Sequence, residues 1–252
     1  MRFLSPVFLF FCFSTLGTLI ACAPVATDLG DDCSQNGCLP ANDNISENEI
    51  HDKNPPRISP EKIYPNPSES EVWAVDLRNL DPSRLVPQRR LREAMAFLRK
   101  NISAFANRRN IVLIDYGLPS SAKRFYIVNL TSGAVQRHLV AHGRGSDPDF
   151  DGYANYFSNE HGSKMTSLGF YVTAETYDGN HGTSLRLNGL SSSNSASRER
   201  AIVIHGASYV RSDLNPIGRS WGCPALDESV VQSVISQIKG GSLIYAFSRD
   251  LP

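Results

Sequence analysis

Residues 201–226, AIVIHGASYVRSDLNPIGRSWGCPAL, constrain the fold and the chemistry of this chain more than any other stretch. The β-branched run 202–204 predicts a buried strand that ends at His205. Cys223 follows in a turn beside Gly222, where the missing side chain leaves amide N–H groups able to face an oxyanion. Cysteine reacts as the thiolate, so it needs a base or a positive charge nearby. His205 and Cys223 are therefore a candidate base–nucleophile pair.

The sequence around this stretch predicts a mainly β domain with two helices. Residues 87–107 carry apolar side chains at helical spacing, with an arginine-rich polar side that faces either solvent or a membrane surface. Asp227 is a suitable N-cap for a second helix after Cys223, and Gly240 ends that helix. Short apolar or alternating runs predict the other strands, at 111–115, 124–130, 134–141, 169–174, 184–190 and 243–247.

The first 21 residues have the composition of an export signal. Arg2 precedes a short apolar run that contains Pro6 and Gly17 and then gives way to polar sequence. Its end, Leu-Ile-Ala-Cys at 19–22, resembles the bacterial lipobox, in which the cysteine is lipidated. We therefore expect a periplasmic lipoprotein, anchored through Cys22 to the outer membrane. Ordinary cleavage at this point and an uncleaved anchor are the alternatives.

Residues 22–84 read as a tether, and residues 85–252 as the folded domain. The tether is acidic and rich in Pro, Asn and Ser. Cys33 and Cys38 can close a small disulfide loop in an oxidising compartment. With Cys12 in the signal and Cys22 lipidated, the remaining free thiol is Cys223. The basic balance of the domain suits an anionic polymer, although random surface charge explains it equally well.

Specific motifs along the domain resemble those of the murein L,D-transpeptidase catalytic domain family. His205-Gly206, followed after a loop by Ser220-Trp221-Gly222-Cys223, is similar to the family's catalytic signature. The resemblance extends over most of the folded part, through AHGRGS (141–146), FSNEHGS (157–163), SLGFYVT (167–173), HGTSLRLNGL (181–190), HGASYV (205–210) and GRSWGCPAL (218–226). Many relatives have an apolar residue and an arginine after the cysteine, whereas Pro224 and Ala225 follow it here.

The resemblance implies a β-sandwich with a helix before and a helix after the cysteine, and a reaction without a cofactor. Cys223 would attack a peptidoglycan stem peptide at its third residue, releasing D-Ala, and an amine would resolve the thioester. His205 would serve as the base, oriented by the Gly206 carbonyl, with N–H groups of Gly222 and Cys223 as the oxyanion hole. An L,D-carboxypeptidase that uses water, or a non-catalytic murein-binding lipoprotein, are the alternatives.

The remaining candidate residues are assigned to substrate or to structure. Ser220 is expected to hydrogen-bond within the cysteine turn, and the proposed substrate contacts are Arg219, Trp221, His142, His181 and Tyr209. Arg219 is the substitute for the arginine that relatives carry after the cysteine. A zinc hydrolase built on His142, His181 and His205 is a further alternative, but their spacing matches no metal motif. No phosphate loop, dinucleotide fingerprint or nucleic-acid motif is present.

Overall fold

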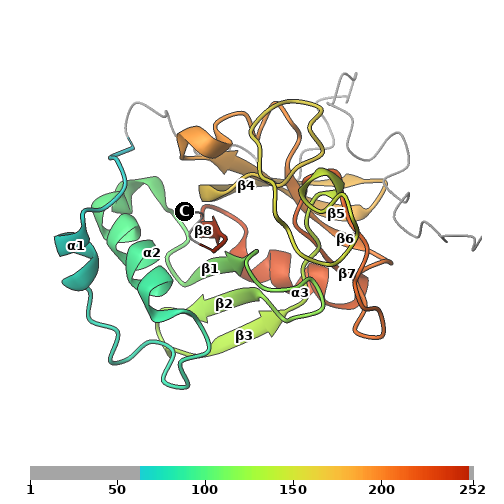
Figure 1. Cartoon of the computed structure of the whole chain (residues 1–252). Coiled ribbons are helices and arrows are strands. Elements are labelled where there is room, and N and C mark those ends of the chain that lie inside the picture. Colours follow the sequence, from blue (N-terminus) through green and yellow to red (C-terminus); the bar gives the residue numbers. More distant parts are fainter. Residues whose placement is uncertain (1–62, 250–252) are drawn as a thin grey trace, which may run out of the picture.

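A continuous sheet organises the computed structural model, which describes residues 63–249 (Figure 1). Eight strands pair in the order β3-β2-β1-β8-β4-β5-β6-β7. Most neighbours are antiparallel, but β1 runs parallel to β8, and β6 runs parallel to β7. The strands are β1 (Asn110–Asp115), β2 (Phe125–Asn129), β3 (Val135–His138), β4 (Gly169–Gly179), β5 (Gly182–Gly189), β6 (Val203–Ala207), β7 (Ala225–Asp227) and β8 (Leu243–Phe247).

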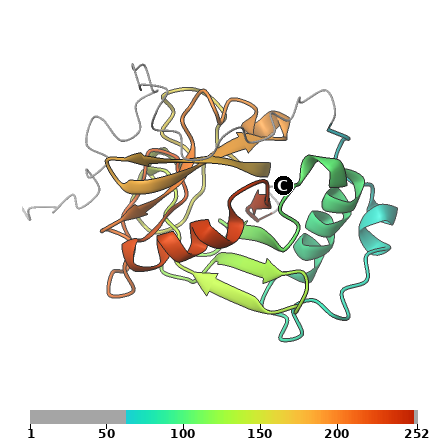
Figure 2. The same cartoon turned by 180° about the vertical axis from the view of Figure 1, so that it is seen from behind.

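Alternation along β1 divides the core between the two faces of the sheet. Val112 and Ile114 belong to the cluster that packs under helix α3 (Glu228–Ile238). Ile111 and Leu113 belong to a second cluster under helix α2 (Gln88–Lys100). Successive side chains of a strand point to opposite faces, so this strand is buried on both sides. Figures 1 and 2 show the two helices covering the sheet from opposite sides. The prediction of a mainly β fold with these two helices is confirmed.

Both long helices begin and end for local reasons. Asp227 caps α3 as predicted, since its carboxylate accepts a hydrogen bond from the Ser229 N–H at 2.8 Å. The first helix is shorter than the predicted 87–107, because α2 ends at Lys100 and a 3-10 turn, Ile102–Ala104, follows. At its end, the Phe97 carbonyl accepts both the Asn101 backbone N–H at 3.0 Å and the Asn101 side-chain amide at 3.1 Å.

The prediction that the tether extends to residue 84 is wrong for its last part. Residues 69–73 form helix α1 (Glu69–Trp73), which lies beside α2 in Figure 1. Val72 and Val75 are buried in the cluster under α2. Arg89 of α2 pairs with Glu69 at 2.6 Å, so part of the basic side of that helix faces acidic side chains. Two or three aliphatic residues are enough to dock a short segment, but too few to give a periodic signal in the sequence.

Two predicted boundaries also shift near the site. Strand β6 includes His205 and Gly206, so the histidine lies within the strand and not at its end. The β4–β5 hairpin turns between Gly179 and Gly182, inside the longer turn that was expected. The predicted signal peptide, the lipidated Cys22 and the Cys33–Cys38 disulfide lie outside the described residues. Within residues 63–249, none of the helices is long and apolar enough to cross a membrane.

Candidate active site

The parallel pairing of β6 with β7 brings the cysteine turn to the histidine. His205 is the register partner of Ala225, two residues beyond Cys223. Cys223 lies in the bend that leads into β7. Cys223 is 2% exposed, and its Sγ lies 3.7 Å from the Ala201 carbonyl oxygen. The β6–β7 pairing therefore brings the cysteine turn close to the strand that carries His205, although the sequence separates them by a long loop.

Ser220 holds the turn through both of its hydrogen-bonding roles. Its Oγ donates to the Cys223 carbonyl at 2.6 Å and accepts from the Gly222 N–H at 3.1 Å, as expected for a hydrogen bond within the turn. The prediction that the Gly222 N–H faces an oxyanion is therefore wrong, because that donor is already used. The Cys223 N–H donates to no acceptor within residues 63–249.

Gly222 is required by both its backbone conformation and its surroundings. Its φ of 126° lies in a region that residues with a side chain rarely adopt. A Cβ at this position would lie 2.8 Å from the Met165 carbonyl oxygen and 3.3 Å from Nη2 of Arg200. The turn therefore presses closely against the 158–166 part of the long loop between β3 and β4.

His205 is oriented by the next residue in its own strand. Its Nδ1 lies 2.9 Å from the Gly206 carbonyl oxygen. A carbonyl only accepts, so the proton is on Nδ1 and the lone pair is on Nε2, which is the form a general base needs. The ring of His181, from the β4–β5 turn, lies 4.7 Å from the His205 ring, centroid to centroid. His181 is thus the predicted substrate residue that contacts the base directly.

His142 has a different environment, and its prediction as a substrate contact is wrong. Its side chain is fully buried, with Nδ1 at 2.7 Å from Nη2 of Arg124 and Nε2 at 3.2 Å from Oδ2 of Asp147. Arginine only donates, so Nδ1 must accept and the ring is neutral, with its proton on Nε2. Burial lowers the pKa of His142 by more than its hydrogen bond to Asp147 raises it. Burial also lowers the pKa of Arg124 to about 10, which leaves the guanidinium charged at neutral pH.

Asp147 links this buried group to the loop and to Arg219. Burial raises the pKa of Asp147, but the hydrogen bond from His142 and two backbone N–H groups outweigh it, so the pKa is lowered overall. The Asp147 carbonyl accepts a hydrogen bond from Arg219. The Arg219 guanidinium also lies over the Phe150 ring at 4.3 Å, and the residue is only 7% exposed. Arg219 therefore binds the loop, and its prediction as a substrate-carboxylate ligand is wrong.

The other two predicted substrate contacts divide between core and surface. Tyr209 belongs to a buried apolar cluster with Val210 and Ile217, and its ring occupies the space that a side chain at position 218 would need. Its prediction as a substrate contact is therefore wrong. Trp221 is half-buried at the turn, with Nζ of Lys164 4.1 Å from its ring centroid. The Trp221 side chain remains beside the nucleophile.

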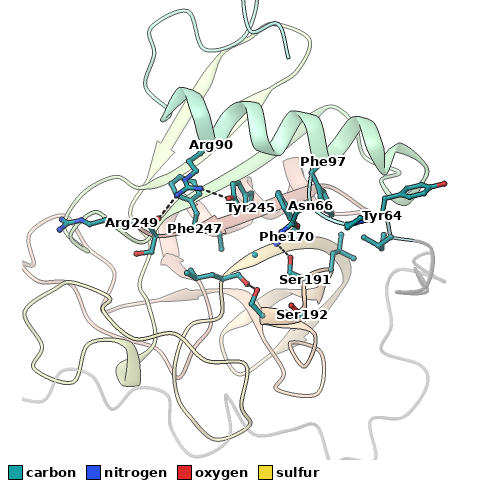
Figure 3. A pocket seen from close by; sticks show the side chains of 18 residues that line it. Tyr64, Asn66, Arg90, Phe97, Phe170, Ser191, Ser192, Tyr245, Phe247 and Arg249 are labelled. Atoms are coloured by element: carbon teal, nitrogen blue, oxygen red, sulfur yellow. Dashed lines mark hydrogen bonds between the residues drawn. The ribbon is translucent and has the colours of Figure 1, made fainter. Parts of the chain in front are cut away.

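Cavities near and far from the cysteine differ in size. A void of about 10 Å³, room for a single water, lies behind the turn between Ser167, Tyr171, Gly222 and Pro224. A cavity of about 640 Å³ lies elsewhere, between α2 and strands β4 and β8 (Figure 3). Neither Cys223 nor His205 lines it. The larger cavity therefore lies apart from the cysteine turn.

The zinc alternative requires three histidines to converge. The rings of His181 and His205 are neighbours, but both nitrogens of His142 are taken by Arg124 and Asp147. Within residues 63–249 no group of three or more His, Cys, Asp or Glu side chains is arranged to hold a metal ion. His142 is therefore not available to join the other two histidines in such a site.

The sequence model of the family described as "L,D-transpeptidase catalytic domain" matches residues 83–247, well over half of the chain. The chain belongs to this family. No curated protein matches the chain in sequence. The match covers the cysteine turn, the histidine strand and the long loop, and it begins close to the predicted start of the domain.

Several solved structures are similar to this L,D-transpeptidase domain at low identity. An L,D-transpeptidase from Mycobacterium smegmatis is 12% identical, with a TM-score of 0.35, over 55% of this chain and 58% of the other. An L,D-transpeptidase from Mycobacterium tuberculosis H37Rv is 12% identical, with a TM-score of 0.37, over 55% and 57%. The helical cell shape determining protein Pgp2 from Campylobacter jejuni is 14% identical, with a TM-score of 0.37, over 58% and 50%. The chain spans little more than half of these proteins, and the likeness is too distant to carry any argument about the site.

Sequence reasoning missed the charged residues that build the walls of the site. Arg124 is fully buried and also donates to the Leu118 carbonyl at 2.6 Å. Arg200 is 8% exposed and donates to the Met165 carbonyl at 2.6 Å. Each stands at the edge of an apolar run, where a solvated arginine gives the same sequence pattern. No sequence signal separates these arginines from solvated ones, since Glu199 directly precedes Arg200 and the sequence alone would suggest an acidic partner.

Proposed function

We propose that the chain is an exported peptidoglycan L,D-transpeptidase with Cys223 as its nucleophile. The observation that carries this proposal is the β6–β7 register, in which His205 pairs with Ala225, two residues after Cys223; the contact of His205 Nδ1 with the Gly206 carbonyl also supports it. Family membership supplies the reaction class. The lone pair, the thiol and the unshared Cys223 N–H supply the base, the nucleophile and one oxyanion donor.

In the first half-reaction, His205 takes the thiol proton on Nε2. The Cys223 thiolate attacks the carbonyl carbon of the third stem residue, and the Cys223 N–H stabilises the resulting oxyanion. The C–N bond to the terminal D-Ala breaks, and the departing amine takes the proton from His205. The product is a thioester on Cys223 together with free D-Ala.

In the second half-reaction, the amine of a neighbouring stem loses a proton to His205 as it attacks the thioester. The C–S bond breaks, a new amide forms, and the proton on His205 returns to the sulfur. Water in place of the amine gives a free carboxylate, which is the carboxypeptidase outcome. Trp221, His181 and the Lys164 cation flank the turn and are the side chains that we expect a stem peptide to contact.

The nucleophile must turn before it reacts. Cys223 is almost fully buried, and its thiol points toward the Ala201 carbonyl at 3.7 Å. Sulfur hydrogen bonds are weak, so a χ1 rotation toward His205 costs little compared with the barrier of the acyl transfer. Hydrogen bonds in ligand-free active sites are commonly long and tighten when substrate binds.

Acylation by a carbapenem tests nucleophile and family together. We expect intact-protein mass spectrometry to show a one-to-one adduct with the wild type and none with Cys223→Ala, and muropeptide analysis to show loss of L,D-cross-links in that variant. Ser236→Ala, an exposed helix serine, is the control and should acylate normally. Binding to murein without an adduct would favour the non-catalytic lipoprotein. Release of D-Ala without cross-links would favour the carboxypeptidase.

Anchoring is a separate part of the proposal. We expect the wild type in the outer-membrane fraction and Cys22→Ala in the soluble periplasm, with a lipid adduct on the N-terminal peptide of the wild type only. Recovery of both proteins in the soluble fraction would contradict the lipid anchor and leave the enzymatic proposal untouched.

A further inference from the structure

Arg200 is a buried cation whose partners are neutral. Its side chain reaches from the segment before β6 to the long loop, where it donates to the Ser158 carbonyl at 2.7 Å and the Met165 carbonyl at 2.6 Å. A third contact, with the Ser163 hydroxyl, is 3.4 Å long. No carboxylate within residues 63–249 forms an ion pair with this guanidinium. A charge removed from water without a counter-ion is costly, so its position calls for a reason.

The guanidinium lies directly against the cysteine turn. Nη2 would be 3.3 Å from a Cβ at Gly222, the residue before the nucleophile. The backbone next to Arg200 also contacts the sulfur. Ala201 follows Arg200, and its carbonyl oxygen lies 3.7 Å from Sγ of Cys223. The arginine side chain and its neighbouring backbone thus enclose the nucleophile from behind.

Two other ionisable groups around the sulfur, both tyrosines, carry no charge at neutral pH. Tyr116 and Tyr171 are fully buried and face Cys223, and burial raises the pKa of both, that of Tyr171 to about 12. Arg200 interacts electrostatically with Tyr171 and Cys223, while burial lowers its own pKa. His205 approaches from β6, and the Lys164 cation lies over the Trp221 ring. Arg200 is therefore the permanent charge set behind the nucleophile.

We propose that Arg200 is a positioning residue whose buried positive charge stabilises the Cys223 thiolate from behind the Gly222 turn. This inference rests on the proposed function, since it takes Cys223 to react as a thiolate. A role in binding a substrate carboxylate fits less well, because Arg200 is 8% exposed and is covered by the turn and the loop. The arrangement supplies the cation that a reactive cysteine needs without an arginine after the cysteine.

The pH dependence of alkylation at Cys223 tests this role. Full-length protein is treated with iodoacetamide across a pH series, and modification of the Cys223 peptide is followed by mass spectrometry, which separates it from the other cysteines. We expect the pH of half-maximal rate to rise by about 1 unit in Arg200→Gln and to stay near the wild-type value in Arg200→Lys, because an opposite charge at short range favours the ionised form. Arg198→Gln, which removes an exposed partner of Glu175, should match the wild type.

Two results would overturn the proposal. One is an unchanged midpoint in Arg200→Gln, and the other is an equal shift in Arg200→Lys and Arg200→Gln, which would mean that Arg200 only ties the loop to the turn. Arg200→Met replaces the Gln variant if the latter unfolds, as judged by thermal melting. Carbapenem acylation measured on the same samples separates the two proposals. Acylation at Cys223 with an unmoved midpoint sinks this inference alone, whereas failure of the wild type to acylate sinks the proposed function.

Discussion

His205 and His142 belong to two regions that look alike in sequence and differ in structure. Both are followed by glycine, and both are almost completely buried. The region of His142 is closed, since an arginine and a carboxylate hold both ring nitrogens. In the region of His205 a backbone carbonyl fixes Nδ1, and the strand pairs with the segment that follows the cysteine turn. A histidine that is hydrogen-bonded to the backbone through one ring nitrogen can still exchange a proton. A histidine that is bonded to charged groups through both nitrogens has a structural role.

The largest expected effect in this comparison comes from replacing His205, the proposed base. We expect His205→Gln to lower kcat by about 10²- to 10⁴-fold, the usual contribution of general acid–base catalysis, while the melting temperature changes little. Turnover of a defined muropeptide, measured with thermal melting on the same sample, gives both values. His142→Gln is the matched variant, and it should reduce stability more than turnover. The opposite ranking of the two variants would show that the roles have been assigned the wrong way round.

The turn itself should be nearly as sensitive. We expect Gly222→Ala to cost about 2–3 kcal/mol in unfolding free energy, because it adds backbone strain to a clash with the Met165 carbonyl. Gly182→Ala is the control, since its φ is also positive at 71° but its Cβ would meet nothing within 4 Å. Its cost should be about 1 kcal/mol. Urea unfolding measures both, and equal costs would show that packing of the turn against the loop contributes nothing.

The sequence was enough to predict most of the strands and the two long helices, because these elements leave local signals. A short apolar run predicted β8 at its observed bounds, and a capping residue predicted the start of α3. The walls of the site left no such signal. Arg124 donates to the Val140 carbonyl and Arg200 to the Met165 carbonyl, and these contacts exist only after the chain has folded. The same reason explains the misplaced Arg219, which looked like a ligand by position and is bound to the loop instead.

A smaller effect distinguishes the closed region by its pH dependence. Burial lowers the pKa of His142 from its ordinary value of 6.5, so the unfolded chain binds this proton more tightly than the folded protein does. Unfolding then takes up a proton below about pH 6.5, and stability should fall as the pH decreases through that point. His142→Gln should lose about 1–2 kcal/mol at pH 7.5 and show a flatter profile between pH 5 and 7.

His138 requires a parallel control, because half-burial also lowers its pKa. We expect His138→Gln, on the outer strand β3, to flatten the same window less than His142→Gln, because His142 is the more deeply buried. Urea midpoints across the pH series measure both profiles. If only His138→Gln flattens the dependence of stability on pH, then His142 does not cause that dependence.

The smallest effect should come from substitution of Arg219. It tests whether Arg219 belongs to the closed region of His142 or to the substrate site. Its guanidinium donates to the Asp147 carbonyl and lies over Phe150, so lysine keeps the charge and loses the flat contact. We expect Arg219→Lys to cost about 1 kcal/mol in stability and to change KM for a stem peptide by less than about twofold. A carboxylate ligand would behave differently, since its loss raises KM while stability is kept. Steady-state kinetics with stem peptides that end in a carboxylate or in an amide decide between the structural role and the ligand role. A KM that rises in Arg219→Lys only for the carboxylate peptide would place Arg219 in the substrate site, and so in the region of His205.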